Sequence, residues 1–231
     1  FALTQVFLAL PAGRYADRHG LKRPVGWAVA VASAGAALAL LFPVFPVLCL
    51  AALMTGGATG AATIALQRHV GRAAHDATQL KRVFSWLAIG PAVSNFIGPF
   101  GAGLLIDHAG SSAGSLEGYR AAFALMALLP LATWFWVRDT VELPPVIAAA
   151  GAAPQRAWDL LNEPRFRRLL AVNWFLSSCW DVHTFVVPLL GHERGLSASV
   201  IGTILGAFAI SAALVRMVMP LVAERLSETV V

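Results

Sequence analysis

Asp181 is an acidic residue near the middle of a largely apolar stretch, residues 167–190. Asn173, Ser177 and Thr184 stand at helical spacing around it, so the four polar side chains share one face of a helix. A carboxylate inside an apolar segment is costly unless water or a partner meets it, and such groups commonly carry protons or bind cations. The pattern therefore predicts a coupling or substrate site. A structural salt bridge or hydrogen bond to another helix explains it equally well, and both interpretations stay open.

Residues 13–23 concentrate charge between two long uncharged stretches. The charged residues are Arg14, Asp17, Arg18, Lys22 and Arg23. Two membrane helices joined by a tight cytoplasmic loop produce this pattern. Gly13 allows close helix approach and Gly20 allows a left-handed turn. Asp17 is placed to accept hydrogen bonds from a helix N-terminus, or to pair with Arg18 and a neighbouring basic residue.

The sequence lacks the motifs of several catalytic classes. It contains no G-x-x-x-x-G-K-[S/T] phosphate loop and no H-E-x-x-H. Its two cysteines, Cys49 and Cys179, both lie inside apolar runs, which argues against a disulfide framework or a metal site. We therefore expect no enzymatic activity, no cofactor and no metal ion.

Composition indicates a membrane protein. Hydrophobic residues make up 58% of the 231 residues and charged residues only 13%, about half the share of an ordinary soluble domain. The net charge of +5 does not indicate nucleic-acid binding, because the basic residues are dispersed among connections between apolar runs. The expected partners are the lipid bilayer and a small solute, and not nucleic acid.

The chain contains seven apolar segments. The first, residues 1–12, spans about 18 Å as a helix, short of a ~30 Å hydrocarbon core, and looks like the end of a helix that begins earlier. The other six are long enough to cross: 24–45, 46–67, 83–106, 119–138, 167–190 and 197–222. The expected fold is all-α, a polytopic transmembrane helical bundle.

The basic residues orient this bundle. Nearly all Lys and Arg lie in alternate connections, as the positive-inside rule requires of cytoplasmic loops. The connections on this predicted cytoplasmic side are 13–23, 68–82, 138–168 and 223–231. The opposite side carries only Arg120 and Arg194.

The spacing G-x-x-x-D-R-x-G-x-K in residues 13–23 resembles the signature loop between the second and third helices of major facilitator superfamily transporters. The residues of this loop are Gly13, Asp17, Arg18, Gly20, Lys22 and Arg23. Leu21 stands where the family usually has a basic residue. A weaker copy, residues 220–227, follows six crossings later, where the second half of the family's parallel repeat carries the same loop.

The resemblance implies a major facilitator fold seen in part, with the segments corresponding to helices 2 to 8 of twelve. Residues 1–138 would then form most of the N-terminal bundle, 139–166 the cytoplasmic linker, and 167–231 the start of the C-terminal bundle. On this reading helix 1 and helices 9 to 12 are missing. The family implies a secondary transporter, usually monomeric, that works by alternating access.

The helix at 83–106 carries a second motif. It resembles the fifth-helix antiporter motif G-x-x-x-G-P-x-x-G-G, although Ala102 replaces one glycine and Ser94 and Asn95 replace small apolar residues upstream. The motif-bearing residues are Gly90, Gly98, Pro99, Gly101 and Gly103. The resemblance favours proton-coupled export. A kinked, closely packed membrane helix explains the same residues, and an uptake transporter, a non-transporting receptor-like protein or a transporter remnant remain alternatives.

The segment 197–222 offers a face for close helix packing. Gly202 and Gly206 follow small-x-x-x-small spacing, continued by Ala209 and Ala213. In the family, helices 5 and 8 meet across the interface between halves; packing within one half is the alternative. The predominance of Arg over Lys and the high alanine content suggest a bacterial inner membrane as the location.

Overall fold

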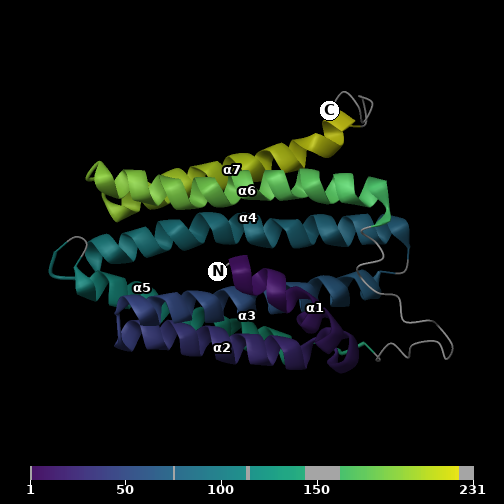
Figure 1. Cartoon of the computed structure of the whole chain (residues 1–231), viewed down its shortest axis with the longest axis horizontal. Helices are drawn as coiled ribbons and strands as arrows, with labels where there is room; N and C mark the ends of the chain where they lie inside the picture. Colours follow the sequence, from purple (N-terminus) through teal and green to yellow (C-terminus); the bar gives the residue numbers. More distant parts are fainter. Residues whose placement is uncertain (1, 75, 113–114, 144–161, 224–231) are drawn as a thin grey trace.

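The computed structural model describes residues 2–74, 76–112, 115–143 and 162–223. These residues form seven α-helices and no strand, which confirms the all-α prediction (Figure 1). The helices are α1 (Ala2–His19), α2 (Lys22–Leu41), α3 (Phe45–Ala73), α4 (Ala77–His108), α5 (Leu116–Val137), α6 (Pro164–Glu193) and α7 (Ala198–Ala223). The predicted repeat loop begins within the last turn of α7, and its residues 224–227 lie outside the described residues, as does most of the predicted linker.

Three layers of roughly antiparallel helices make up the bundle (Figure 1). α1, α2, α3 and α5 lie together on one side, α4 lies in the middle, and α6 and α7 lie on the other side. Small residues dominate the buried positions, which lets membrane helices approach closely without a conventional hydrophobic core. One cluster of buried residues joins α1, α2, α3 and α5: Ala16, Leu21, Val25, Val29 and Ala65, with Trp134 and Val137 packed against it.

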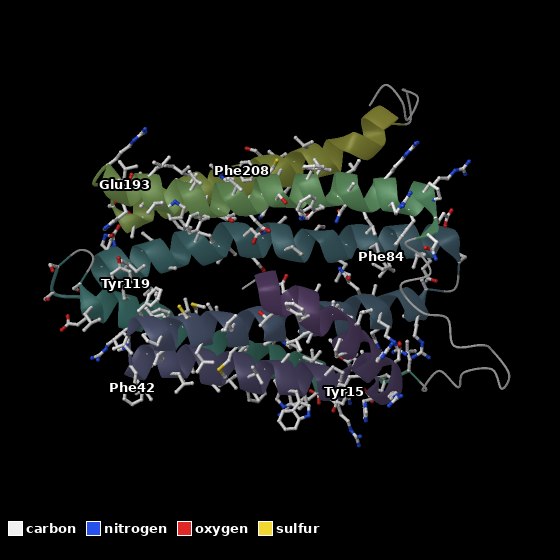
Figure 2. The ribbon with its side chains drawn as sticks, viewed as in Figure 1. Tyr15, Phe42, Phe84, Tyr119, Glu193 and Phe208 are labelled. Carbon is white, nitrogen blue, oxygen red and sulfur yellow. The ribbon has the colours of Figure 1, made fainter. Side chains whose placement is uncertain are left out.

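Residues from alternate connections lie at opposite ends of the bundle. Tyr15 and Phe84 lie toward one end, which we call the predicted cytoplasmic end (Figure 2). Phe42, Tyr119 and Glu193 lie toward the other, which we call the predicted outer end. Large apolar side chains cover the flanks of the bundle; Trp136, for example, is 81% exposed. Such a surface suits lipid and not water.

The helices reach further than the charge pattern predicted. The loop expected at 13–23 is helical through His19, and only Gly20 and Leu21 separate α1 from α2. The loop expected at 68–82 is likewise reduced to residues 74–76 between α3 and α4. Arginine is a good helix former, so charge marks where a helix leaves the apolar layer and not where it ends.

Five helices are long and apolar enough to cross a membrane. They are α2, α3, the Arg82–His108 part of α4, α5 and the Ala198–Val215 part of α7. α6 was also expected to cross; its 30 residues would extend about 45 Å, but three arginines near its start and Asp181 at its centre reduce its average apolarity. The chain is a multi-pass membrane protein by the length and composition of its helices.

Candidate functional site

α4 and α7 pack with their backbones in contact. A Cβ added at Gly202 on α7 would lie 2.4 Å from the carbonyl oxygen of Pro99 on α4. A Cβ at Gly103 on α4 would lie 2.4 Å from the carbonyl oxygen of Ala198 on α7. A Cβ at Gly206 would lie 2.6 Å from a phenylalanine ring of α4. The small face of α7 therefore meets the glycine-proline helix, as one of the two interpretations of that face expected.

The antiporter-like motif contributes only part of its residues to this contact. Pro99 and Gly103 are one turn apart and share the face that meets α7. Added Cβ atoms at Gly90, Gly98 and Gly101 would meet no described atom within 4 Å. These three glycines lie on other faces of α4, because each residue advances the helix by about 100°. The motif thus divides into a packed face and an open one.

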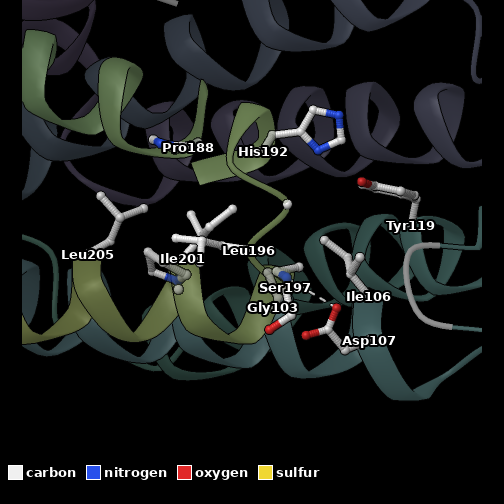
Figure 3. Close-up of a pocket in the computed structure, with 15 residues that line it drawn as sticks. Gly103, Ile106, Asp107, Tyr119, Pro188, His192, Leu196, Ser197, Ile201 and Leu205 are labelled. Carbon is white, nitrogen blue, oxygen red and sulfur yellow. Dashed lines mark hydrogen bonds between the residues drawn. The ribbon is translucent and has the colours of Figure 1, made fainter. Parts of the chain in front are cut away.

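Asp107 joins α4 to α7 at the predicted outer end, a role that the sequence analysis did not assign. Its Oδ1 accepts a hydrogen bond from the backbone N–H of Ala198 at 3.2 Å (Figure 3). Its Oδ2 accepts one from the backbone N–H of Ser199 at 2.7 Å. The one sequence signal was its place a turn beyond Gly103, on the face that meets α7. Its hydrogen-bond partners are 91 and 92 residues away along the chain, so no local sequence pattern predicts them.

A cavity of about 730 Å³ lies beside this contact, lined by α4, α5, α6, α7 and the turn before α7 (Figure 3). Its walls are mainly apolar, with Ile201 and Leu205 from α7 among them. Tyr119 and His192 add polar groups toward the predicted outer end. An apolar cavity with a few polar groups is the usual form of a small-molecule site.

The polar face predicted on α6 is present and exposed. Asn173, Ser177, Asp181 and Thr184 all have exposed side chains on one helix. The Thr184 hydroxyl donates to the backbone carbonyl of Asp181 at 2.9 Å, which is a bond within the helix. Among the described residues, no basic side chain pairs with the Asp181 carboxylate. The described part of the chain therefore contains no salt-bridge partner for Asp181.

α6 rests on α7 through rings next to this polar face. The rings of Trp180 and His183 lie 5.0 Å and 3.9 Å from the ring of Phe208, between centroids. A Cβ at Gly191 would lie 2.7 Å from the side chain of Ile201, so the helices also meet closely near the predicted outer end. His183 packs against α7 through this ring contact, and Asp181 lies about 100° round the helix from Trp180.

Three threonines of α3, spaced by four residues, bond to their own helix. The hydroxyls of Thr55, Thr59 and Thr63 each donate to the carbonyl four residues earlier, at 2.8 Å. These hydroxyls are satisfied by their own helix, which is the common arrangement for threonine in a membrane helix.

The signature residues at the predicted cytoplasmic end hold α1 against its neighbours. Gly20 has φ +76°, in the left-handed region that its type permits. Gly13 faces α3, where an added Cβ would be 4.0 Å from a methyl group of Ile64. Asp17 forms its ion pair with Arg68 of α3, and not with Arg18 as the sequence analysis had considered. The backbone carbonyl of Asp17 accepts a second hydrogen bond from Arg68, at 3.2 Å.

Glu142, which follows α5, supplies the acid at the N-terminus of α2. Its Oε1 accepts hydrogen bonds from the backbone N–H groups of Leu21 at 2.8 Å and Lys22 at 2.7 Å. A Cβ at Gly20 would lie 2.7 Å from the same oxygen, so a larger residue there would displace the carboxylate. The sequence predicts Asp17 as an acceptor at a helix N-terminus, whereas Glu142 holds that position at α2. No local pattern indicates Glu142, because its two partners are 121 and 120 residues away along the chain.

Comparison with known proteins identifies the family of the chain. The family model described as Major Facilitator Superfamily matches residues 1–230 of the chain. No curated protein and no solved structure matches it.

Proposed function

The chain belongs to the major facilitator superfamily of membrane transporters, and on this premise we propose that it exports a small solute by alternating access in exchange for protons. The observation that carries the proposal is the backbone contact between Pro99 of the antiporter-like motif and Gly202 of α7. This contact gives the motif a mechanical role, since it joins α4 to a helix that we assign to the second half of the transporter. Residues 1–138 and 167–231 are the proposed parts of the two halves, with 139–166 as their linker.

Asp181 is the proposed coupling residue. Of the acidic residues in the described helices, it alone lies far from a helix end. Its exposed carboxylate has no described cation beside it, so it is free to bind a proton or a cationic group. Burial disfavours the charged form of a carboxylate and hydration favours it. A helix face that is alternately wet and dry therefore releases and binds a proton at this position.

Asn173, Ser177 and Thr184 are the proposed neighbours of the solute. The amide of Asn173 and the hydroxyl of Ser177 form no hydrogen bond with another described residue, and both side chains are exposed. They offer a donor and acceptor set on the same face as Asp181. A solute with both polar and cationic groups suits this combination.

The signature residues of α1 and its turn are proposed to act on the conformational change and not on the solute. Asp17, Arg18, Gly20, Lys22 and Arg23 lie at the predicted cytoplasmic end, away from the middle of the bundle where Asp181 lies. Solute sites of secondary transporters lie near the bilayer midplane. These residues therefore influence turnover more than affinity.

The test uses the protein expressed from its complete reading frame and reconstituted in liposomes with an acidic interior. A pH-sensitive dye inside reports protons, and a panel of small organic cations, zwitterions and anions is added outside. A compound that is exchanged for protons raises the internal pH and accumulates inside. Protein-free liposomes and a protonophore are the controls.

Two results would contradict the proposal. Solute movement without any change in internal pH would exclude proton exchange, and accumulation that requires protons to move in the same direction would indicate uptake. No movement of any compound in the panel, by protein that is folded and correctly inserted, would favour a receptor-like protein or a remnant.

A further inference from the structure

The Asp107 carboxylate lies at the N-terminus of α7 and accepts hydrogen bonds from its backbone N–H groups. The first backbone N–H groups of any helix lack partners within the helix. Ser197, just before α7, accepts from Val200 through its hydroxyl at 3.4 Å. The backbone N–H groups of Ala198 and Ser199 both donate to the Asp107 carboxylate. α7 thus supplies one capping bond itself, and α4 supplies the other two.

The negative charge also has a favourable place. The N-terminus of a helix carries partial positive charge, which stabilises a carboxylate in contact with it. Each oxygen of Asp107 accepts from a different N–H, so the geometry fixes the direction from which the end of α4 approaches α7. A neutral or shorter side chain keeps less of this interaction.

The carboxylate lies at one end of a run of backbone contacts. Gly103 meets Ala198 one turn away from Asp107, and Pro99 meets Gly202 a turn further on. Further toward the predicted cytoplasmic end, α7 diverges from α4 (Figure 1). The structure therefore has α4 and α7 joined at the predicted outer end and separated toward the other.

We propose that Asp107 is a positioning residue for transport, which favours the conformation in which the outer ends of α4 and α7 are joined. The proposal rests on alternating access as proposed above. The opposite conformation must part these ends, and water then replaces the carboxylate at Ala198 and Ser199. The exchange is reversible because Asp107 is only partly buried and lies beside the cavity, where water can reach both partners. Asp107 acts through α7 and does not need to contact the solute.

Labelling of single cysteines tests this positioning role. In protein with Cys49 and Cys179 replaced by serine, one reporter is Leu205→Cys, in the cavity. The other is Ala92→Cys, one turn from Phe96 toward the predicted cytoplasmic end. Membrane-impermeant maleimide is applied from either side of liposomes of known orientation. The variants are Asp107→Asn, which keeps the shape and removes the charge, and Asp107→Glu, which restores the charge.

The expected result is a reciprocal change. Asp107→Asn should raise outside labelling at Leu205→Cys about two- to fivefold, the effect of losing one carboxylate from a helix N-terminus. It should lower inside labelling at Ala92→Cys in the same protein, and Asp107→Glu should move both rates back. Glu117→Gln is the control, because Glu117 is an acid at the same end that accepts from Ser111 and does not contact α7.

Three outcomes decide the matter. Unchanged labelling at both reporters in folded Asp107→Asn protein would overturn the proposal. Faster outside labelling without slower inside labelling would also overturn it, because that is local fraying of α7. Reciprocal labelling in a protein that moves no solute would support the role of Asp107 and contradict the proposed transport, so the two failures are distinguishable.

Discussion

Arg68 on α3 binds Asp17 on α1 twice, once at the side-chain carboxylate and once at the backbone carbonyl. Arg68 is largely buried, with 15% of its side chain exposed, whereas Asp17 is 61% exposed. The arginine is therefore held by the packing of α1 on α3, and the acid stays within reach of other partners. An acid in this state can exchange one partner for another as helices move.

Asp17→Asn should slow transport with little change in the affinity for solute. The variant loses the charge that holds Arg68 but keeps the backbone bond, and a partly exposed ion pair contributes roughly 0.2–1 kcal/mol. Initial rates over a range of solute concentrations in proteoliposomes separate kcat from KM. The control is Arg14→Gln, a charge change on the same helix at a residue that forms no ion pair among the described residues. A large rise in KM with normal kcat would contradict this assignment.

Glu142→Ala should destabilise the fold at the start of α2 by about 1 kcal/mol, the usual cost of losing a helix cap. The N–H groups of Leu21 and Lys22 lose their acceptor in this variant. Thermal unfolding in detergent, followed by tryptophan fluorescence, measures the change in Tm. Asp139→Ala is the matched control, since Asp139 is close in sequence, 78% exposed and paired only with its neighbour Arg138 among the described residues. Equal Tm values for the two variants would show that Glu142 does not stabilise the N-terminus of α2.

Gly202→Ala and Gly98→Ala should have opposite effects although both add one methyl group to a helix. The methyl at 202 would meet the backbone of Pro99, which cannot move aside, so we expect a loss of about 1–3 kcal/mol. The methyl at 98 meets no described atom, and alanine in a helix is about 0.5–1 kcal/mol more favourable than glycine. Unfolding in detergent compares them directly. A Gly202→Ala protein as stable as the parent would show that α4 and α7 are not held at this distance.

The contact of α4 with α7 could be predicted because its causes are local. Glycines four residues apart on α7 and a glycine-proline step on α4 are patterns that one helix displays by itself. The helix count followed from the same kind of signal, the length of apolar runs. The ends of α1 and α3 did not, because arginine-rich turns were read as loops although arginine continues a helix as well as most residues. The stop signal was Gly20, whose left-handed conformation ends the run.

Asp107 and Glu142 could not be assigned from the sequence for a different reason. Each satisfies the first N–H groups of a helix about a hundred residues away along the chain. A capping residue within the same helix leaves a recognisable spacing, whereas a cap supplied by another helix leaves none. Only the packing of α4 on α7, and of the segment after α5 on α2, brings these partners together.

The membrane topology predicts which surface positions share a side. Arg18→Cys and Ser112→Cys should react with an impermeant maleimide from opposite sides of the membrane, because one lies at the end of α1 and the other in the connection between α4 and α5. Arg138→Cys should react from the same side as Arg18→Cys. Labelling of intact cells and of inverted vesicles gives the two sides. Reaction of positions 18 and 112 from one side would overturn the predicted topology.

Asp181→Asn should abolish proton-driven export and leave binding or solute exchange partly intact. The amide keeps the size and hydrogen-bonding capacity of the side chain but cannot take up and release a proton. Asn173, Ser177 and Thr184 remain on the same face to hold the solute. The measurement is solute accumulation against a gradient in acid-loaded proteoliposomes, beside solute-for-solute exchange at equal pH in the same preparation. Glu193→Gln, an acid at the end of the same helix, is the control and should retain both activities. Accumulation at the normal rate by Asp181→Asn would make Asp181 a structural residue and place the coupling group elsewhere.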